Sequence, residues 1–115
     1  MHEVYIAESL LETVIFKCKE NGFNCVKSIK VKIGKASMVS ADSLIFAFDA
    51  LKVGSIAENA SLIVDVTPST GYCKVCIREF DVDKDFIFEC PFCKSDKVII
   101  KTGNGVDLTE LEVEI

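Results

Sequence analysis

Residues 61–76 read Ser-Leu-Ile-Val-Asp-Val-Thr-Pro-Ser-Thr-Gly-Tyr-Cys-Lys-Val-Cys and join two different kinds of sequence. In the first half, apolar residues alternate with more polar ones, which predicts a half-buried strand over residues 61–67. Pro68 ends this strand, because proline cannot donate a ladder hydrogen bond. Beyond it the chain becomes rich in charge and cysteine, beginning with the pair Cys73 and Cys76. We therefore expect the strand to lead out of one structural unit and into another.

Two helices and a further strand are predicted before this strand. Apolar residues recur every three to four positions over residues 4–21, which predicts an amphipathic helix that stops at Asn21-Gly22. Residues 28–33 alternate Ile or Val with Ser or Lys and predict a half-buried strand. A second helix is predicted over residues 41–53, with Ser40 as its N-cap. Both helices carry an apolar face that a sheet would cover.

A third strand is predicted after residues 103–105, which read Gly-Asn-Gly. Leu and Val alternate with Glu toward the end of the sequence, but Val106 and Leu108 are one position out of phase, so we expect a β-bulge near Thr109. The cysteine-rich segment consequently lies between two strands of one sheet. We predict an α+β fold with two helices packed on a three-stranded sheet and an inserted zinc-ribbon-like domain. The two predicted parts are residues 1–67 plus 106–115 and residues 68–105.

Composition and charge limit the class of protein. The 115 residues suffice for one domain with a small appendage, and half of them are apolar, which argues against disorder. A formal net charge of −5 has the wrong sign for a protein that neutralises nucleic-acid phosphates. No apolar run approaches the roughly 20 residues that span a membrane, and charged residues interrupt the region where a signal peptide would lie. We expect a cytoplasmic protein with no nucleic-acid and no membrane partner.

Four of the six cysteines form two Cys-x-x-Cys pairs, Cys73 with Cys76 and Cys90 with Cys93, separated by 13 residues. This spacing lets two tight turns point four thiolates at one ion at the roughly 2.3 Å of a zinc–sulfur bond. Four thiolates leave no open coordination position, so we expect a structural Zn(II) that replaces a core too small to form alone. A tetrahedral sulfur site also suits one iron, and two separate redox pairs are a third interpretation. Residues 72–101 carry six basic and six acidic side chains, which argues against a zinc ribbon that binds nucleic acid.

His2 is the only histidine of the sequence and lies beside its first residue. The α-amino group of Met1, the amide nitrogen between Met1 and His2 and the His2 imidazole can chelate one metal through small adjacent rings. Such a nitrogen-rich set suits Ni(II) or Cu(II), which stand high enough in the Irving–Williams order to displace an amide proton. Glu3 can add a carboxylate. The alternative interpretation is that Glu3 is a favourable acidic residue in the first turn of a helix.

Several motifs occur in order along the chain: Met1-His2-Glu3 before an amphipathic helix, Val31-Lys32-Ile33-Gly34, Leu44-Ile45-Phe46-Ala47-Phe48 and Cys90-Pro91-Phe92-Cys93. With these motifs the chain resembles the HypA family of hydrogenase nickel-insertion accessory proteins. The resemblance implies a metallochaperone with a nickel-binding domain and a separate structural zinc domain. It further implies that Met1, His2 and Glu3 hold Ni(II) transiently and that the four paired cysteines hold Zn(II).

The resemblance also implies partners. Family members work with the GTPase HypB to load the large subunit of nickel–iron hydrogenase, and some assist urease maturation beside urease accessory proteins. We expect a monomer or a weak homodimer. Relatives often have a small residue after each Cys-x-x-Cys pair, where this chain has Ile77 and Lys94, so we expect looser turns with the ligand set intact. Asp42 is a further candidate oxygen ligand, although a role at the start of the second helix is our preferred interpretation.

The other features predict no enzyme. Cys18 and Cys25 lack a nearby partner thiol or histidine in the sequence, so we expect buried free thiols. The sequence has one histidine and neither a phosphate-binding loop nor a recognisable pair of catalytic carboxylates. The residues alone leave two other functions open. One is a zinc-ribbon module that docks a protein without transporting metal, and the other is an Fe(Cys)4 electron carrier, which an absorption spectrum would identify.

Overall fold

The computed structural model describes residues 2–82, 89–102 and 105–114, and the chain divides into two compact units. Unit 1 consists of Met1–Lys32, Val39–Asp65 and Asp107–Ile115, and unit 2 consists of Ile33–Met38 and Val66–Val106. This division differs from the predicted domain boundaries chiefly in Ile33–Met38, which packs with unit 2. Among the described residues, no helix is long and apolar enough to cross a membrane.

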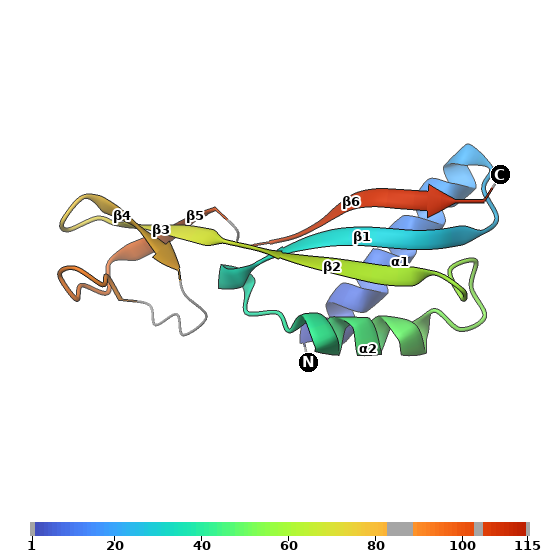
Figure 1. Ribbon diagram of the computed structural model, residues 1–115, viewed down its shortest axis with the longest axis horizontal. Coiled ribbons are helices and arrows are strands. Elements are labelled where there is room, and N and C mark those ends of the chain that lie inside the picture. The colour runs from blue at the N-terminus through green and yellow to red at the C-terminus, as the bar shows by residue number, and fades with distance from the viewer. Residues whose placement is uncertain (1, 83–88, 103–104, 115) are drawn as a thin grey trace. The chain divides into compact units, whose positions relative to one another are not determined.

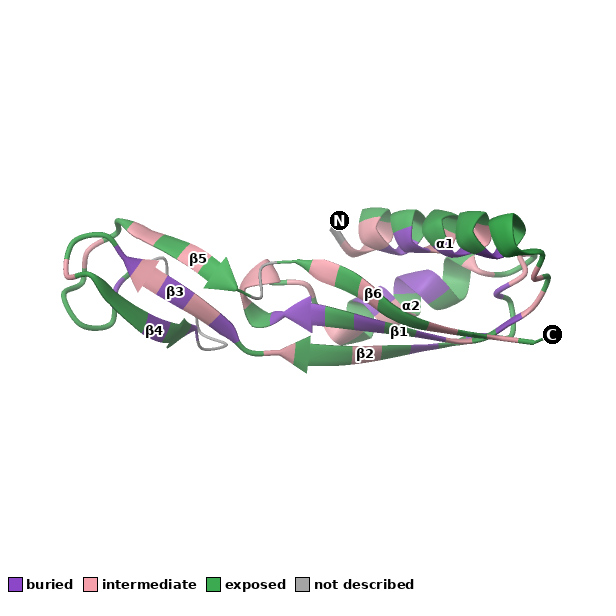
Figure 2. Ribbon diagram, turned by 90° about the horizontal axis from the view of Figure 1, so that it is seen from above, coloured by how far each residue is buried: buried purple, intermediate pink, exposed green. Residues whose placement is uncertain are grey.

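Two helices and a three-stranded sheet form the first part of the fold. The helices are α1, His2–Asn21, and α2, Ala41–Leu51; the strands are β1, Val26–Gly34, β2, Ser61–Thr67, and β6, Val106–Val113. The strand order is β2-β1-β6, so β1 is central (Figure 1). Both helices lie on one face of this sheet (Figure 2). The predicted α+β architecture is confirmed.

The core of unit 1 follows the periodicity of the sequence. Helix α1 buries one stripe at helical spacing: Ala7, Leu10, Val14 and Cys18. Strand β1 and helix α2 contribute buried residues at their own periods: Ile29, Val31, Leu44, Ala47 and Phe48. The lysines between the buried residues of β1 are exposed, as the alternation predicts. Removal of these apolar faces from water stabilises the packing of the helices on the sheet.

Some element ends differ from the predicted positions. Helix α1 begins at His2 and β1 begins at Val26, both earlier than predicted. Helix α2 ends at Leu51, before the predicted end, where the N–H of Lys52 donates to the carbonyl of Phe48 at 2.9 Å and closes the last turn.

Strand β6 changes the phase of its exposed side chains. Asp107 and Thr109 are exposed, and so are Glu110 and Glu112, so the alternation shifts by one residue between Thr109 and Glu110. The shift lies where we expect a β-bulge, and the bulge itself stays a prediction.

Unit 2 is built on a second three-stranded sheet. Its strands are β3, Ser69–Cys73, β4, Arg78–Val82, and β5, Val98–Thr102, in the order β4-β3-β5. Strand β3 pairs antiparallel with both neighbours. A short 3₁₀ helix, η1, Lys35–Ser37, also belongs to this unit.

The core of unit 2 is small. It consists of Cys73, Phe80, Val82 and Cys90, with partly buried side chains such as Ala36 packed against it. The N–H of Ala36 donates to the Oγ of Ser69 at 2.9 Å, which ties the Ile33–Met38 segment to β3. A core that contains two cysteines and so few large apolar residues needs a further source of stability.

Candidate metal centres

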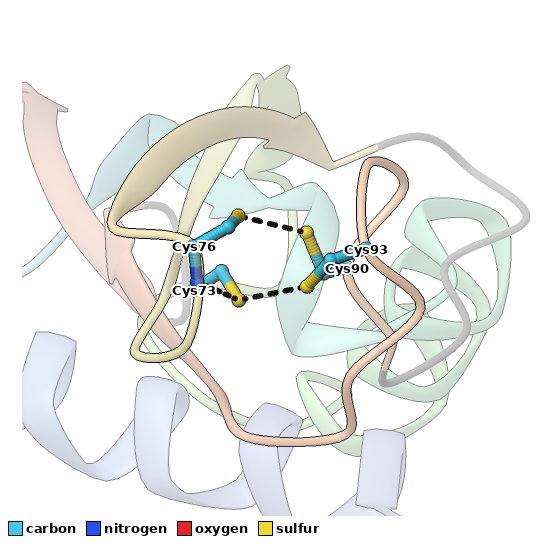
Figure 3. Close-up of side chains that lie close together, drawn as sticks. All are labelled: Cys73, Cys76, Cys90 and Cys93. Atoms are coloured by element: carbon cyan, nitrogen blue, oxygen red, sulfur yellow. Dashed lines mark hydrogen bonds between the residues drawn. The ribbon is translucent and has the colours of Figure 1, made fainter.

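The sulfur atoms of Cys73, Cys76, Cys90 and Cys93 converge in unit 2 and all lie within 4.8 Å of one another (Figure 3). The Sγ atoms of Cys73 and Cys93 are 3.6 Å apart, and those of Cys76 and Cys90 are 3.7 Å apart. Disulfide bonds, at about 2.05 Å, are absent from this cluster, and all four are free cysteines. The structure brings the four residues of the predicted zinc site together.

The spacing of these sulfurs suits a tetrahedral metal ion. In a regular tetrahedron with metal–sulfur bonds of about 2.3 Å, neighbouring sulfurs lie about 3.8 Å apart. The two close pairs in the structure, at 3.6 and 3.7 Å, already have nearly this separation. The four cysteines therefore fit a structural zinc with no open coordination position, and the same geometry would accept one iron.

Each Cys-x-x-Cys pair forms a closed turn of the same kind. The N–H of Ile77 donates to the carbonyl of Cys73 at 3.0 Å, and the N–H of Lys94 donates to the carbonyl of Cys90 at 2.9 Å. Ile77 and Lys94 have φ values of 58° and 65°, in the left-handed region that favours glycine. The looser turns that we expect from the sequence are not observed, because both turns are closed. Instead, Ile77 and Lys94 adopt a strained left-handed backbone conformation.

The thiols fall into two types, because backbone N–H groups point at some of the sulfurs. The N–H of Cys76 donates to the Sγ of Cys73 at 3.5 Å and lowers the pKa of Cys73. Burial acts to raise the pKa of Cys90, but the N–H of Cys93 and that of the residue before it outweigh burial and lower this pKa to about 6. Burial and hydrogen bonds to neighbouring sulfurs raise the pKa of Cys76 to about 12. The pKa of Cys93 is also raised, although the N–H of Ser95 acts to lower it.

Each close sulfur pair thus joins one acidic thiol to one weakly acidic thiol. Cys73 faces Cys93, and Cys90 faces Cys76. The sulfurs of each pair lie within hydrogen-bond distance, and either sulfur can be the donor. The lowered pKa values of Cys73 and Cys90 favour the thiolate form that metal binding requires.

The predicted nickel site lies at the start of α1. Met1 and the side chain of His2 lie outside the described residues, whereas Glu3 is described. The Glu3 carboxylate accepts a hydrogen bond from the backbone N–H of Ser40 at 3.4 Å. Ser40 is the N-cap of α2, as predicted, and its Oγ accepts from the N–H of Ser43 at 3.3 Å. Asp42 is exposed in the first turn of α2 and lines the same groove as Glu3.

The two remaining cysteines are free thiols. Cys18 is 1% exposed, and burial raises the pKa of its thiol, which confirms the prediction of a buried free thiol. Cys25 is only half-buried, so the prediction of burial is wrong in degree at this position. Loss of hydration and a hydrogen bond with Glu114 raise the pKa of Cys25.

Comparison with known proteins gives consistent results along the whole chain. The family model described as "Hydrogenase/urease nickel incorporation, metallochaperone, hypA" matches residues 1–113. The chain belongs to the HypA family. A hydrogenase maturation factor HypA from Prosthecochloris aestuarii is 37% identical over 114 residues, covering 99% of this chain and 100% of the relative. One from a Picosynechococcus species is 35% identical over 113 residues, covering 98% and 99%.

Solved structures of HypA proteins have the same fold. The solution structure of the nickel metallochaperone HypA from Helicobacter pylori matches with a TM-score of 0.70 and 26% identity, and 96% of each chain is covered. The predicted family, and with it the function of a nickel metallochaperone for hydrogenase maturation, is confirmed.

Two features of the HypA cysteine site were not predicted from the sequence. Ala36 packs against the cysteine core although it lies far from every cysteine of the site in the sequence. The guanidinium of Arg78 lies 5.1 Å from the centroid of the Phe92 ring, a cation–π contact between β4 and the second cysteine turn. The left-handed φ values of Ile77 and Lys94 could have been predicted from the sequence, because each residue directly follows a Cys-x-x-Cys pair.

Proposed function

We propose that this chain binds one Ni(II) with the amine of Met1, the amide nitrogen and imidazole of His2, and the carboxylate of Glu3. The observation that carries the proposal is the position of Glu3 in the first turn of a helix that begins at His2. Its carboxylate is held against the N-terminus of α2 by the N–H of Ser40. One ligand is therefore already fixed in place, whereas the nitrogen ligands come from the two residues before it.

The start of α1 tolerates a deprotonated amide. The first four N–H groups of a helix have no acceptor within the helix, so loss of the His2 amide proton removes no helical hydrogen bond. The positive end of the helix dipole disfavours a cation, but the deprotonated amide and Glu3 add compensating negative charge. A site made from chain-terminal groups forms and dissolves without rearrangement of the core, which suits a carrier.

We propose that Cys73, Cys76, Cys90 and Cys93 hold Zn(II) as a structural ion. Four thiolates leave the ion no position for substrate, so its contribution is to fold unit 2 around a core of few apolar residues. An Fe(Cys)4 centre is red when oxidised and zinc is silent, so the absorption spectrum of the purified protein decides between them.

The proposed pathway is delivery of nickel in the cytoplasm, with a HypB-like GTPase as partner and the large subunit of nickel–iron hydrogenase as recipient. Urease accessory proteins are a second route in this family. The role assigned to the chain is carriage of a metal ion, not catalysis. The support for these partners is membership of the HypA family.

Titration of Ni(II) into the zinc-loaded protein tests the nickel site. We expect His2→Ala to abolish tight binding and Glu3→Ala to weaken it, since each removes a ligand. Glu8→Ala is the matched control, because Glu8 is an exposed glutamate of the same helix outside the first turn. If His2→Ala and Glu3→Ala bind nickel as the parent does, the assignment of the site is wrong.

A further inference from the structure

Three large apolar side chains of the two cysteine turns of unit 2 are exposed to water. Val75 and Ile77, in and directly after the first turn, are 56% and 71% exposed, and Phe92 in the second turn is 56% exposed. The two turns adjoin, because their sulfur atoms all lie within 4.8 Å of one another (Figure 3). The Phe92 ring also lies 5.1 Å from the guanidinium of Arg78, the residue that follows Ile77. We call Val75, Ile77 and Phe92 the cysteine-turn patch.

The fold does not account for the side chain of Ile77. Its φ of 58° lies in the left-handed region, which disfavours a residue with a Cβ and a β-branched residue most of all. The side chain is too exposed to offset this strain by packing, and the core of unit 2 is built from other residues. Backbone strain that the surrounding structure does not offset is typical of functional positions. Contact with another molecule would explain why an apolar side chain occupies this position.

The border of the cysteine-turn patch is basic. Residues 73–78 and 90–97 contain four of the 13 basic residues of the chain but one of its 18 acidic residues. All five are exposed: Lys74, Arg78, Lys94, Lys97 and Asp96. Four thiolates around Zn(II) carry a net negative charge, which is reduced by backbone N–H groups that donate to the Sγ of Cys73 at 3.5 Å and to the Sγ of Cys90 at 3.4 Å.

Apolar side chains within a basic border favour one kind of occupant. A second copy of the patch presents the same basic border and is repelled. A nucleic acid or an anionic membrane would also meet the carboxylates of Glu79 and Asp81, which lie with Phe92 around a hollow of about 360 Å³. A short protein segment covers a smaller area and can avoid these carboxylates. The patch therefore fits an acidic protein segment that carries apolar side chains.

We propose that the cysteine-turn patch binds an acidic segment of the protein that receives the nickel, the precursor of the hydrogenase large subunit. Apolar side chains of that segment cover Ile77 and Phe92, and its carboxylates pair with Lys74 and Lys94. The patch includes none of the proposed nickel ligands, so the recipient stays bound while nickel leaves them. The inference rests on the proposed function, because it assigns a surface to the recipient of that function.

The test is the affinity of the zinc-loaded protein for the purified large-subunit precursor of the same organism, measured by biolayer interferometry. We expect Phe92→Ala and Ile77→Gly each to weaken binding by at least about ten-fold, the scale of an interface anchor. Ile77→Gly should at the same time bind zinc more tightly, because it removes the backbone strain. A structural role of Ile77 alone would not produce these opposite changes. Binding by the parent should weaken as salt is raised, because the contact pairs opposite charges.

Met38→Gly is the matched control for Ile77→Gly. Met38 is also an exposed apolar residue of unit 2 in the left-handed region, with a φ of 59° and 68% exposure, but it lies outside the cysteine turns. Its replacement should change the affinity for the precursor less than about two-fold. Lys74→Glu leaves every apolar side chain of the patch in place and should weaken binding by at least about five-fold through charge alone. Zinc content and circular dichroism check that each variant is folded.

Several results would overturn the docking proposal. They are no binding of the precursor by the parent, equal affinity of the parent, Ile77→Gly and Lys74→Glu, and an equal loss of affinity in Met38→Gly. Variants that lose affinity for the GTPase or for an RNA oligonucleotide, but not for the precursor, would identify a different occupant and also overturn it. Nickel titration separates the two proposals, because Ile77→Gly should bind nickel as the parent does, whereas failure of the terminal site appears as equal nickel binding by His2→Ala and the parent.

Discussion

Replacement of Ile77 by glycine should stabilise unit 2. Ile77 has a φ of 58°, and the left-handed conformation costs a residue with a Cβ about 1–2 kcal/mol. The side chain is 71% exposed, so its removal exposes little buried surface, and the N–H that closes the turn is retained. Glycine has more freedom in the unfolded chain, which offsets roughly 0.5–1 kcal/mol of the gain. We expect a net stabilisation of about 1 kcal/mol.

The assay is competition for zinc with a chelator, because folding of unit 2 and metal binding are coupled. A gain of about 1 kcal/mol corresponds to a roughly five-fold higher zinc affinity. Val75→Gly is the control, since Val75 is 56% exposed in the same turn and does not have a positive φ. It should lower the affinity slightly. If both variants lower the affinity equally, the argument from backbone strain at Ile77 is refuted.

Three further predictions concern the two units. Gly71→Ala should destabilise unit 2 by about 1–3 kcal/mol in urea unfolding, because the new Cβ would lie 2.5 Å from Phe80 Cζ; Gly105→Ala, with no atom within 4 Å, should have little effect, and equal effects would contradict the steric argument. Ser40→Ala should lower the thermal stability of unit 1 by about 1 kcal/mol, through loss of the N-cap, but leave nickel affinity unchanged, because Glu3 bonds to the backbone N–H of this residue. Zinc binding near neutral pH should release fewer than four protons, because backbone N–H groups lower the pKa of Cys90 to about 6, so its thiol is already largely a thiolate before zinc arrives. Calorimetry in buffers of different ionisation enthalpy counts these protons, and a release of four would contradict the assignment. Zinc affinity should fall further as the pH drops through about 6, where Cys90 takes up its proton.

Local patterns in the sequence were sufficient to predict most of the fold. The helical spacing of apolar residues predicted one buried face of α1 but left Leu10 or Leu11 and Val14 or Ile15 as alternatives on it. In the structure the buried stripe consists of Ala7, Leu10, Val14 and Cys18. The alternation around Val31 predicted the buried side of β1. The cysteine cluster was predictable from two identical short spacings, which place the sulfurs of each turn together whatever the rest of the chain does.

Contacts between distant residues were not predictable in this way. Ala36 packs in the core of unit 2, and Glu3 meets the N–H of Ser40, 37 positions along the chain. Neither residue type nor local spacing predicts these long-range contacts, because they depend on how the folded helices and strands pack together. Even the left-handed φ of Ile77 ran against local preference, since closure of the cysteine turn outweighs the preference of a β-branched residue.

The most direct test of the central claim, that Ni(II) is bound by the terminal amine together with His2 and Glu3, is a nickel titration of the zinc-loaded protein with one glycine added before Met1. The extension leaves every side chain in place but converts the Met1 amine into an amide. We predict that tight nickel binding is lost while zinc content and the circular dichroism spectrum are unchanged. Nickel affinity equal to that of the unextended protein would contradict the account.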